Sequence, residues 1–98
     1  MILKKNNENS LGDVLKQLFD AYGWTEKMDG VRIINSWEKI VGGIFAKHTT
    51  NLYVKNKKLY VILDSSVLRN ELYMERSTLV KKLNNEIGKK VIDEIIFS

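Results

Sequence analysis

Residues 49–63, with the sequence TTNLYVKNKKLYVIL, decide the fold that we expect for this chain. Apolar residues alternate with polar or aromatic ones on both sides of Asn56-Lys57. Such alternation is typical of strands that bury one face. The pattern therefore predicts a β-hairpin with Asn56-Lys57 as its turn, although Asn-Gly would be a stronger turn signal. The apolar residues of the expected buried face are Leu52, Val54, Leu59, Val61 and Leu63.

An amphipathic helix is expected well before the hairpin. Ser10 and Asp13 have the spacing of a capping box, which satisfies the free N–H groups at a helix start. Apolar residues then recur every three or four positions until Gly23, which suits a helix end. Residues 1–9 show no periodicity, so we expect a flexible N-terminal arm followed by one domain over 10–98.

A second helix is expected between Gly23 and the hairpin. Thr25 can cap its start, and Gly42-Gly43 should end or bend it, giving one bent helix or two shorter ones. The two tryptophans of this region, Trp24 and Trp37, are expected to be core residues or hydrophobic-staple residues at a helix start rather than parts of a ligand site.

After the hairpin, the sequence predicts a long helix followed by a final strand. The helix starts at Ser65 or Ser66, carries leucines at helical spacing and ends at Gly88. Val91–Phe97 is rich in β-branched residues and is expected to pair with the second hairpin strand after the helical crossover. The fold class is thus α+β, with the order α-α-β-β-α-β and a three-stranded sheet packed against helices.

The composition excludes several classes of function. The chain has 98 residues, no cysteine and one histidine, which removes disulfide scaffolds, thiolate metal sites and most His-based catalytic sites. We therefore expect no enzyme activity, no cofactor and no metal. No apolar run is long enough for a membrane helix, and residues 1–5 are too short for a signal peptide, so we expect a cytoplasmic protein without a membrane partner.

The positive charge is concentrated in one segment. The chain has a net charge of +4, yet residues 39–60 alone contain five lysines and no acidic residue. Tyr53 and Tyr60 lie out of phase with the apolar face, so they can stand beside these lysines, a combination suited to base stacking and phosphate neutralisation. Lysines at hairpin turns are also common for solubility, so charge alone leaves both interpretations open.

The block from Trp37 to Thr49 begins with a Trp-x-x-Ile-Val-Gly signature. With this block as its most specific part, the residue order from about Leu11 to Phe97 resembles that of a known family, the bacterial DciA proteins. The resemblance implies a fold like a type II KH domain and a role as an accessory of the replicative DnaB-type DNA helicase, helping to place it on DNA. It implies no small-molecule substrate.

Nucleic-acid contact, if made, should use side-chain charge, because the Gly-x-x-Gly loop of RNA-binding KH domains is missing. The pairs Lys81-Lys82 and Lys89-Lys90 could be solvated helix and loop charges, or could extend a basic patch if the fold brings them near the hairpin. Local packing and hydrogen bonding at a helix end is the alternative expectation for His48. The candidate nucleic-acid-binding residues are Lys47, His48, Lys55, Lys57, Lys58, Arg69, Lys81 and Lys82.

The alternative function is a protein-interaction module that does not touch nucleic acid. Tyr73 and Met74 lie off the leucine stripe of the long helix and are its candidate partner-binding residues. Packing of the same two side chains against the first helix would be an equally simple explanation.

Overall fold

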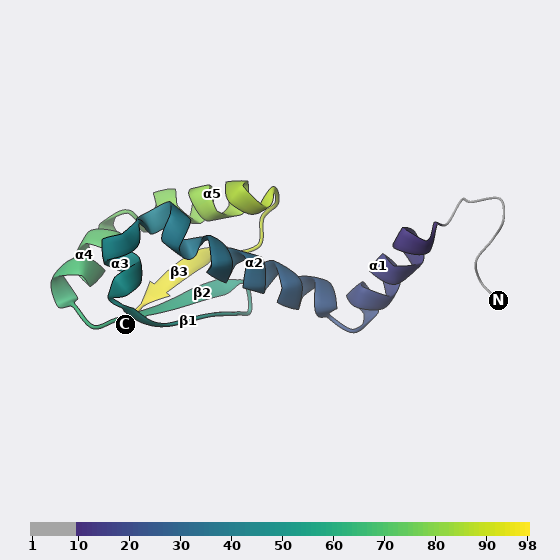
Figure 1. The fold of residues 1–98 in the computed structure, drawn as a ribbon, viewed down its shortest axis with the longest axis horizontal. Coiled ribbons are helices and arrows are strands. Elements are labelled where there is room, and N and C mark those ends of the chain that lie inside the picture. Colours follow the sequence, from purple (N-terminus) through teal and green to yellow (C-terminus); the bar gives the residue numbers. More distant parts are fainter. Residues whose placement is uncertain (1–9) are drawn as a thin grey trace.

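A computed structural model describes residues 10–98, which form eight helices and strands (Figure 1). The expected arm of residues 1–9 lies outside this described part of the chain. The mixed architecture confirms the predicted α+β class, with a three-stranded sheet against helices. The elements are α1 (Leu11–Ala21), α2 (Trp24–Val41), α3 (Gly43–Lys47), β1 (Thr49–Lys55), β2 (Lys58–Leu63), α4 (Ser66–Met74), α5 (Arg76–Ile87) and β3 (Glu94–Phe97).

The sheet has the strand order β1-β2-β3. β1 and β2 are antiparallel, and β2 and β3 are parallel. The predicted two-residue turn is confirmed: Asn56 and Lys57 have φ values of 53° and 62°, the left-handed conformation that type I′ hairpins require at both positions. Within the described residues, helices lie over one face of the sheet and leave the other face open (Figure 1).

The core lies between this sheet and the helices. Trp37 of α2 is only 2% exposed, and its Nε1 donates a 3.1 Å hydrogen bond to Thr49 Oγ1, which in turn donates to the carbonyl of Phe45. The expected core position of Trp37 is therefore confirmed, and its polar atom is satisfied. The buried hydrophobic residues are Ile33, Trp37, Leu59, Val61, Leu63, Leu72, Leu79, Leu83, Ile92 and Ile95.

The predicted cap of α2 is wrong. The helix begins one residue after Gly23, which has a φ of 71° and occupies the N-cap position without a side-chain hydrogen bond. Thr25 Oγ1 instead donates a 2.6 Å hydrogen bond to Asp20 Oδ1. At the other end, Gly42 has a φ of 92° and separates α2 from α3, so the alternative of two helices is the one observed.

The single long helix expected after the hairpin is two helices. Glu75, with φ −101° and ψ 12°, ends α4 and precedes α5. The positions three and four residues after the buried Leu72 are Glu75 and Arg76, and the next buried residue is Leu79. No core contact therefore holds a continuous helix across Glu75. The expected helix end at Gly88 is confirmed, with a φ of 93°.

The last strand is shorter than expected because Asn84 of α5 binds the backbone before it. Asn84 Oδ1 accepts hydrogen bonds from the N–H groups of Val91 and Ile92, and Asn84 Nδ2 donates to the carbonyl of Ile92. These bonds replace ladder pairing, so β3 begins at Glu94 rather than at Val91.

α1 extends away from the sheet, which makes the molecule elongated, 58 × 20 × 20 Å (Figure 1). Its predicted capping box is present, with Ser10 and Asp13 bonding each other's backbone N–H groups. Trp24, at the start of α2, is 53% exposed, so of the two expected roles the core position is wrong, and the role of a staple residue stays a prediction.

Candidate nucleic-acid interface

The hairpin turn gathers three of the predicted basic residues. Lys55 and Lys58 are directly paired across β1 and β2, with Lys57 in the turn between them. The carbonyl of Lys57 accepts a 2.7 Å hydrogen bond from the N–H of Asp93, which ties the turn to the segment after α5. Because the turn is short and anchored, its lysines project from a rigid backbone.

The same hydrogen bond brings Lys89 and Lys90 to the hairpin. Together with the turn and the first part of α2, they line a cleft of about 790 Å³. At this cleft, Lys89 Nζ lies 2.6 Å from Asp29 Oδ2, and Lys90 Nζ lies 3.4 Å from Asp93 Oδ1. The lining lysines outnumber the lining acids by five to three: Lys27, Lys55, Lys57, Lys89 and Lys90 against Asp20, Glu26 and Asp29.

The open sheet face places aromatic side chains next to this charge. Tyr53 is paired with Tyr60, and Tyr60 with Ile96, so the three residues form one row across the sheet. The next row towards the turn contains Lys55, Lys58 and Glu94, with Lys58 Nζ 4.0 Å from Glu94 Oε1. Residues two apart on a strand point to the same face, so the aromatic row and the lysine row share one surface.

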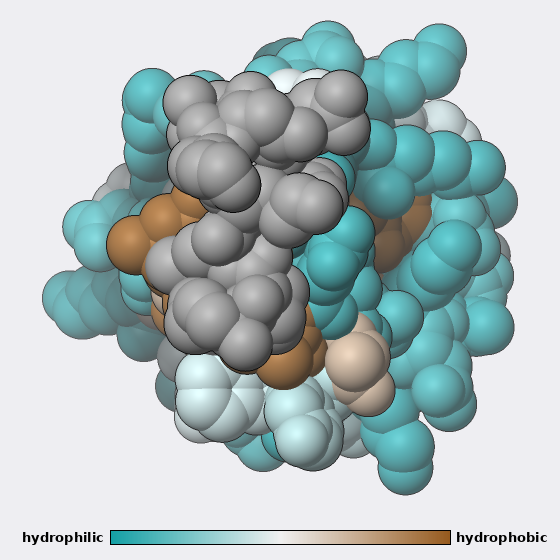
Figure 2. All heavy atoms as spheres, turned by 90° about the vertical axis from the view of Figure 1, so that its right-hand side faces the viewer, coloured by the Kyte–Doolittle hydropathy of each residue, from teal (hydrophilic) through white to brown (hydrophobic). Residues whose placement is uncertain are grey.

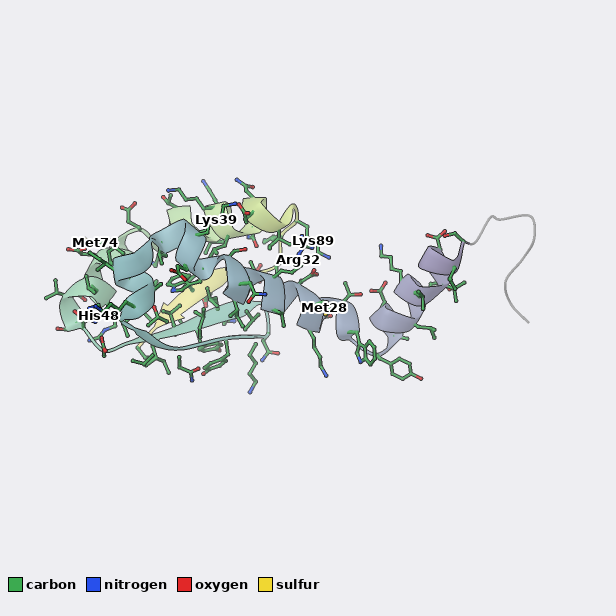
Figure 3. The ribbon with its side chains drawn as sticks, in the orientation of Figure 1. Met28, Arg32, Lys39, His48, Met74 and Lys89 are labelled. Carbon is green, nitrogen blue, oxygen red and sulfur yellow. The ribbon has the colours of Figure 1, made fainter. Side chains whose placement is uncertain are left out.

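Two other predicted residues lie at the opposite end of the hairpin. Lys47 and His48 directly precede β1, and the seven residues of that strand separate them from the turn by about 20 Å. His48 Nδ1 lies 2.8 Å from Asp64 Oδ1, and the His48 carbonyl accepts the Asp64 N–H. Figure 3 shows His48 near the end of the molecule away from α1 and Lys89 near the middle, at the other end of α5 and the sheet. The local hydrogen-bonding role expected as the alternative for His48 is the one observed.

Arg69, Lys81 and Lys82 are also away from the turn. Arg69 lies on α4, which follows β2 at the His48 end, and is half-buried. Lys81 and Lys82 are exposed on α5, and Lys81 lines a groove of about 900 Å³ between α5 and β3 that shares Lys89 and Lys90 with the cleft. The predicted basic residues therefore do not form one patch: Lys55 and Lys58 lie in the row next to the tyrosines on the same face, whereas Lys81 lies in the groove beside β3.

Tyr73 and Met74, at the end of α4, are 50% and 72% exposed. The Tyr73 ring contacts the Phe97 ring edge-on at 6.4 Å, and the Arg76 guanidinium lies 3.9 Å from its centre. Tyr73 is therefore held by Phe97 and Arg76 and not by the first helix. Met74 lies at the end of the molecule away from α1 (Figure 3), so the expected alternative of packing against the first helix is wrong for both residues.

Neither a metal centre nor a membrane span is found in residues 10–98. No group of three or more His, Asp or Glu side chains in this range could hold a metal ion. None of its helices is long and apolar enough to cross a membrane.

Comparison with known proteins identifies the family. A family model described as "Dna[CI] antecedent, DciA" matches residues 10–97. The chain belongs to the DciA family. It is also 30% identical over 86 residues to a UPF0232 protein of Corynebacterium glutamicum (strain R). That match covers 88% of this chain and 48% of the relative, so the chain spans about half the length of the curated protein it matches.

The DciA family is associated with the replicative helicase. The block that carries the DciA resemblance has structural roles here. Trp37 fills the core, Gly42 allows the sharp passage from α2 to α3, and Thr49 accepts the indole hydrogen bond. The block from Trp37 to Thr49 therefore specifies how α2, α3 and β1 are joined, and the basic turn and the tyrosine row follow it within the matched residues.

Proposed function

We propose that this DciA-family chain is a DNA-replication accessory protein that binds the replicative helicase and contacts single-stranded DNA through its hairpin. The observation that carries the DNA contact is the shared surface of Lys55 and Lys58 with Tyr53 and Tyr60 on the open sheet face. Family membership supports the helicase association.

The tyrosine row suits single-stranded nucleic acid. The rings of Tyr53 and Tyr60 are nearly parallel, at 8°, with centres 4.8 Å apart, so each covers one side of the other. Tyr53 lies on the edge strand and is 41% exposed, which leaves it available to an unpaired base. Bases of a duplex are already stacked and cannot use such a ring, whereas those of a single strand can.

The lysines of the turn supply the second component of the contact. Phosphates that follow the stacked base would meet Lys55, Lys57 and Lys58 one row away. Neutralising three phosphates of a single strand gives a slope of about −2 for log K against log salt. The affinity of this contact is thus mainly electrostatic, and binding depends little on the base sequence of the DNA.

Fluorescence anisotropy with a labelled single-stranded oligonucleotide across a salt series tests this proposal. The variant Lys55→Glu, Lys57→Glu, Lys58→Glu should lose most of its affinity and most of its salt slope. A matched control, Lys47→Glu, Lys81→Glu, Lys82→Glu, changes the net charge by the same amount away from the turn. It should weaken binding much less, and equal losses in the two variants would refute the hairpin site.

The second candidate function is a protein-interaction module that does not touch DNA. It is favoured by the exposure of Tyr73 and Met74 beside the groove between α5 and β3. Capture of the cognate replicative helicase by the wild-type chain and by a Tyr73→Ala, Met74→Ala variant tests this surface. Reduced capture with unchanged oligonucleotide binding would assign the helicase contact to it, and undiminished capture would rule it out.

A further inference from the structure

α1 presents an apolar stripe that the rest of the described residues, 10–98, leave uncovered. Leu11, Leu15 and Leu18 of α1 are 60%, 41% and 48% exposed, and Tyr22, the C-cap that directly follows the helix and completes the stripe, is 72% exposed. Figure 2 looks at this end of the molecule and shows brown hydrophobic side chains at the surface among hydrophilic ones. Contiguous exposed apolar side chains of this kind mark a surface that another macromolecule covers.

The stripe is arranged symmetrically about the middle of the helix. A two-fold axis through the middle of the stripe relates α1 to an antiparallel second copy. This axis exchanges position 11 with position 22 and position 15 with position 18. Leu11 of one helix would thus face Tyr22 of an antiparallel second copy, and Leu15 would face Leu18. A surface that is complementary to itself in this way is what a two-fold symmetric dimer requires.

The other side chains of α1 favour the same pairing. Asp13, Lys16 and Asp20 point more than about 130° away from the centre of the stripe, given 3.6 residues per turn. The pairing therefore buries no charge and opposes no like charges. Gly12 and Ala21, about 90° to either side of the centre of the stripe, also exchange places in the antiparallel arrangement.

We infer that α1 is a homodimerisation helix that pairs antiparallel with α1 of a second copy through Leu11, Leu15, Leu18 and Tyr22. α1 extends beyond the end of the sheet that holds the hairpin turn (Figure 1). The dimer would therefore place both basic turns beside the shared helix pair, where one DNA strand could reach both. Dimerisation itself does not depend on DNA binding.

Sedimentation equilibrium of the whole chain between about 1 and 500 μM tests the inference. The wild type should approach twice its monomer mass of 11.4 kDa as concentration rises. A Leu15→Glu, Leu18→Glu variant should remain monomeric over the same range, with the near-ultraviolet circular dichroism of its core unchanged. The matched control Lys16→Glu, Gln17→Glu, on the other side of the same helix, should dimerise like the wild type.

The orientation can be measured because the chain has no cysteine of its own. Tagged Leu15→Cys mixed with untagged Leu18→Cys and oxidised mildly should give mainly the mixed disulfide. Disulfides that join like positions in preference would indicate a parallel pair and overturn the antiparallel arrangement. A wild type that stays monomeric at every concentration, or a control variant that fails to dimerise, would overturn the inference itself.

Discussion

Tyr53 lies directly opposite Tyr60 across β1 and β2, with the two rings stacked at 4.8 Å on the face of the sheet that no helix of the described residues covers. Aromatic pairs on a half-covered sheet stabilise the hairpin by cross-strand contact. Here the pair also holds the Tyr53 ring in a fixed position beside the lysines of the turn. A ring that is held in advance loses little freedom when a base stacks on it.

Replacing Tyr53 with alanine should weaken binding of single-stranded DNA. Loss of one stacked base costs about 1–3 kcal/mol, or roughly 5- to 150-fold in affinity. Anisotropy at constant salt measures the change, and Tyr73→Ala, which removes a half-exposed tyrosine elsewhere, serves as the control. An unchanged affinity for Tyr53→Ala would mean that the ring has no part in binding.

Asp29→Asn should strengthen DNA binding while it weakens the fold. The Asp29 carboxylate holds Lys89 at 2.6 Å and lies 4.0 Å from Arg32, so its neutralisation frees Lys89 at the cleft and removes one negative charge from the cleft lining. Stability should fall by only about 1 kcal/mol, because Lys89 is half exposed and solvent screens the pair. Anisotropy and urea denaturation measure the two effects, and a loss of DNA affinity in the folded variant would contradict this role of the cleft.

Trp37→Ala should remove much of the stability of the domain. The side chain is 2% exposed, and truncating a buried tryptophan costs about 3–5 kcal/mol, so the thermal midpoint should fall by more than about 10 °C. Thr49→Val should cost less, about 1–3 kcal/mol, by leaving the indole N–H without its acceptor. A thermal midpoint of Trp37→Ala close to that of the wild type would show that the ring contributes little.

Gly42→Ala and Gly43→Ala should have opposite effects on stability. No heavy atom lies within 4 Å of a Cβ added at either glycine, so backbone conformation decides the outcome. Gly42 has a φ of 92° and a ψ of 165°, a region that is essentially restricted to glycine, so alanine costs about 1–3 kcal/mol there. Gly43 begins α3 without a positive φ, and alanine there should stabilise by about 0.4–1 kcal/mol. Denaturant midpoints that shift in the same direction would contradict this explanation.

Local sequence signals succeeded where the deciding contacts are close along the chain. The turn at Asn56-Lys57, the Ser10–Asp13 capping box and the end of α5 at Gly88 each depend on hydrogen bonds or φ values within a few residues. The prediction of the α2 N-cap was wrong because both Thr25 and Gly23 can occupy an N-cap position. Thr25 instead donates a hydrogen bond to Asp20, and Gly23 is the N-cap.

The boundaries in the second half of the chain depend on packing between distant elements. Nothing near Glu75 marks a break except the missing apolar residue between Leu72 and Leu79, which a periodicity argument passes over. The late start of β3 depends on Asn84, whose side chain takes the backbone groups of Val91 and Ile92. No pattern in the sequence near Val91 indicates that a distant side chain will take these backbone hydrogen bonds.

The candidate site likewise combines features that the local sequence sets with features that depend on contacts between distant elements. The sequence by itself determined that the positive charge is concentrated around a hairpin with two tyrosines on its outer face, because strand alternation fixes the side to which each residue points. Only the tertiary structure decided which lysines act together. The hydrogen bond from Asp93 to Lys57 brings Lys89 and Lys90 to the turn, whereas the length of β1 keeps Lys47 and His48 at the other end. The apolar stripe of α1 was readable from its spacing, but that it remains uncovered depends on where the rest of the chain folds, which no local pattern contains.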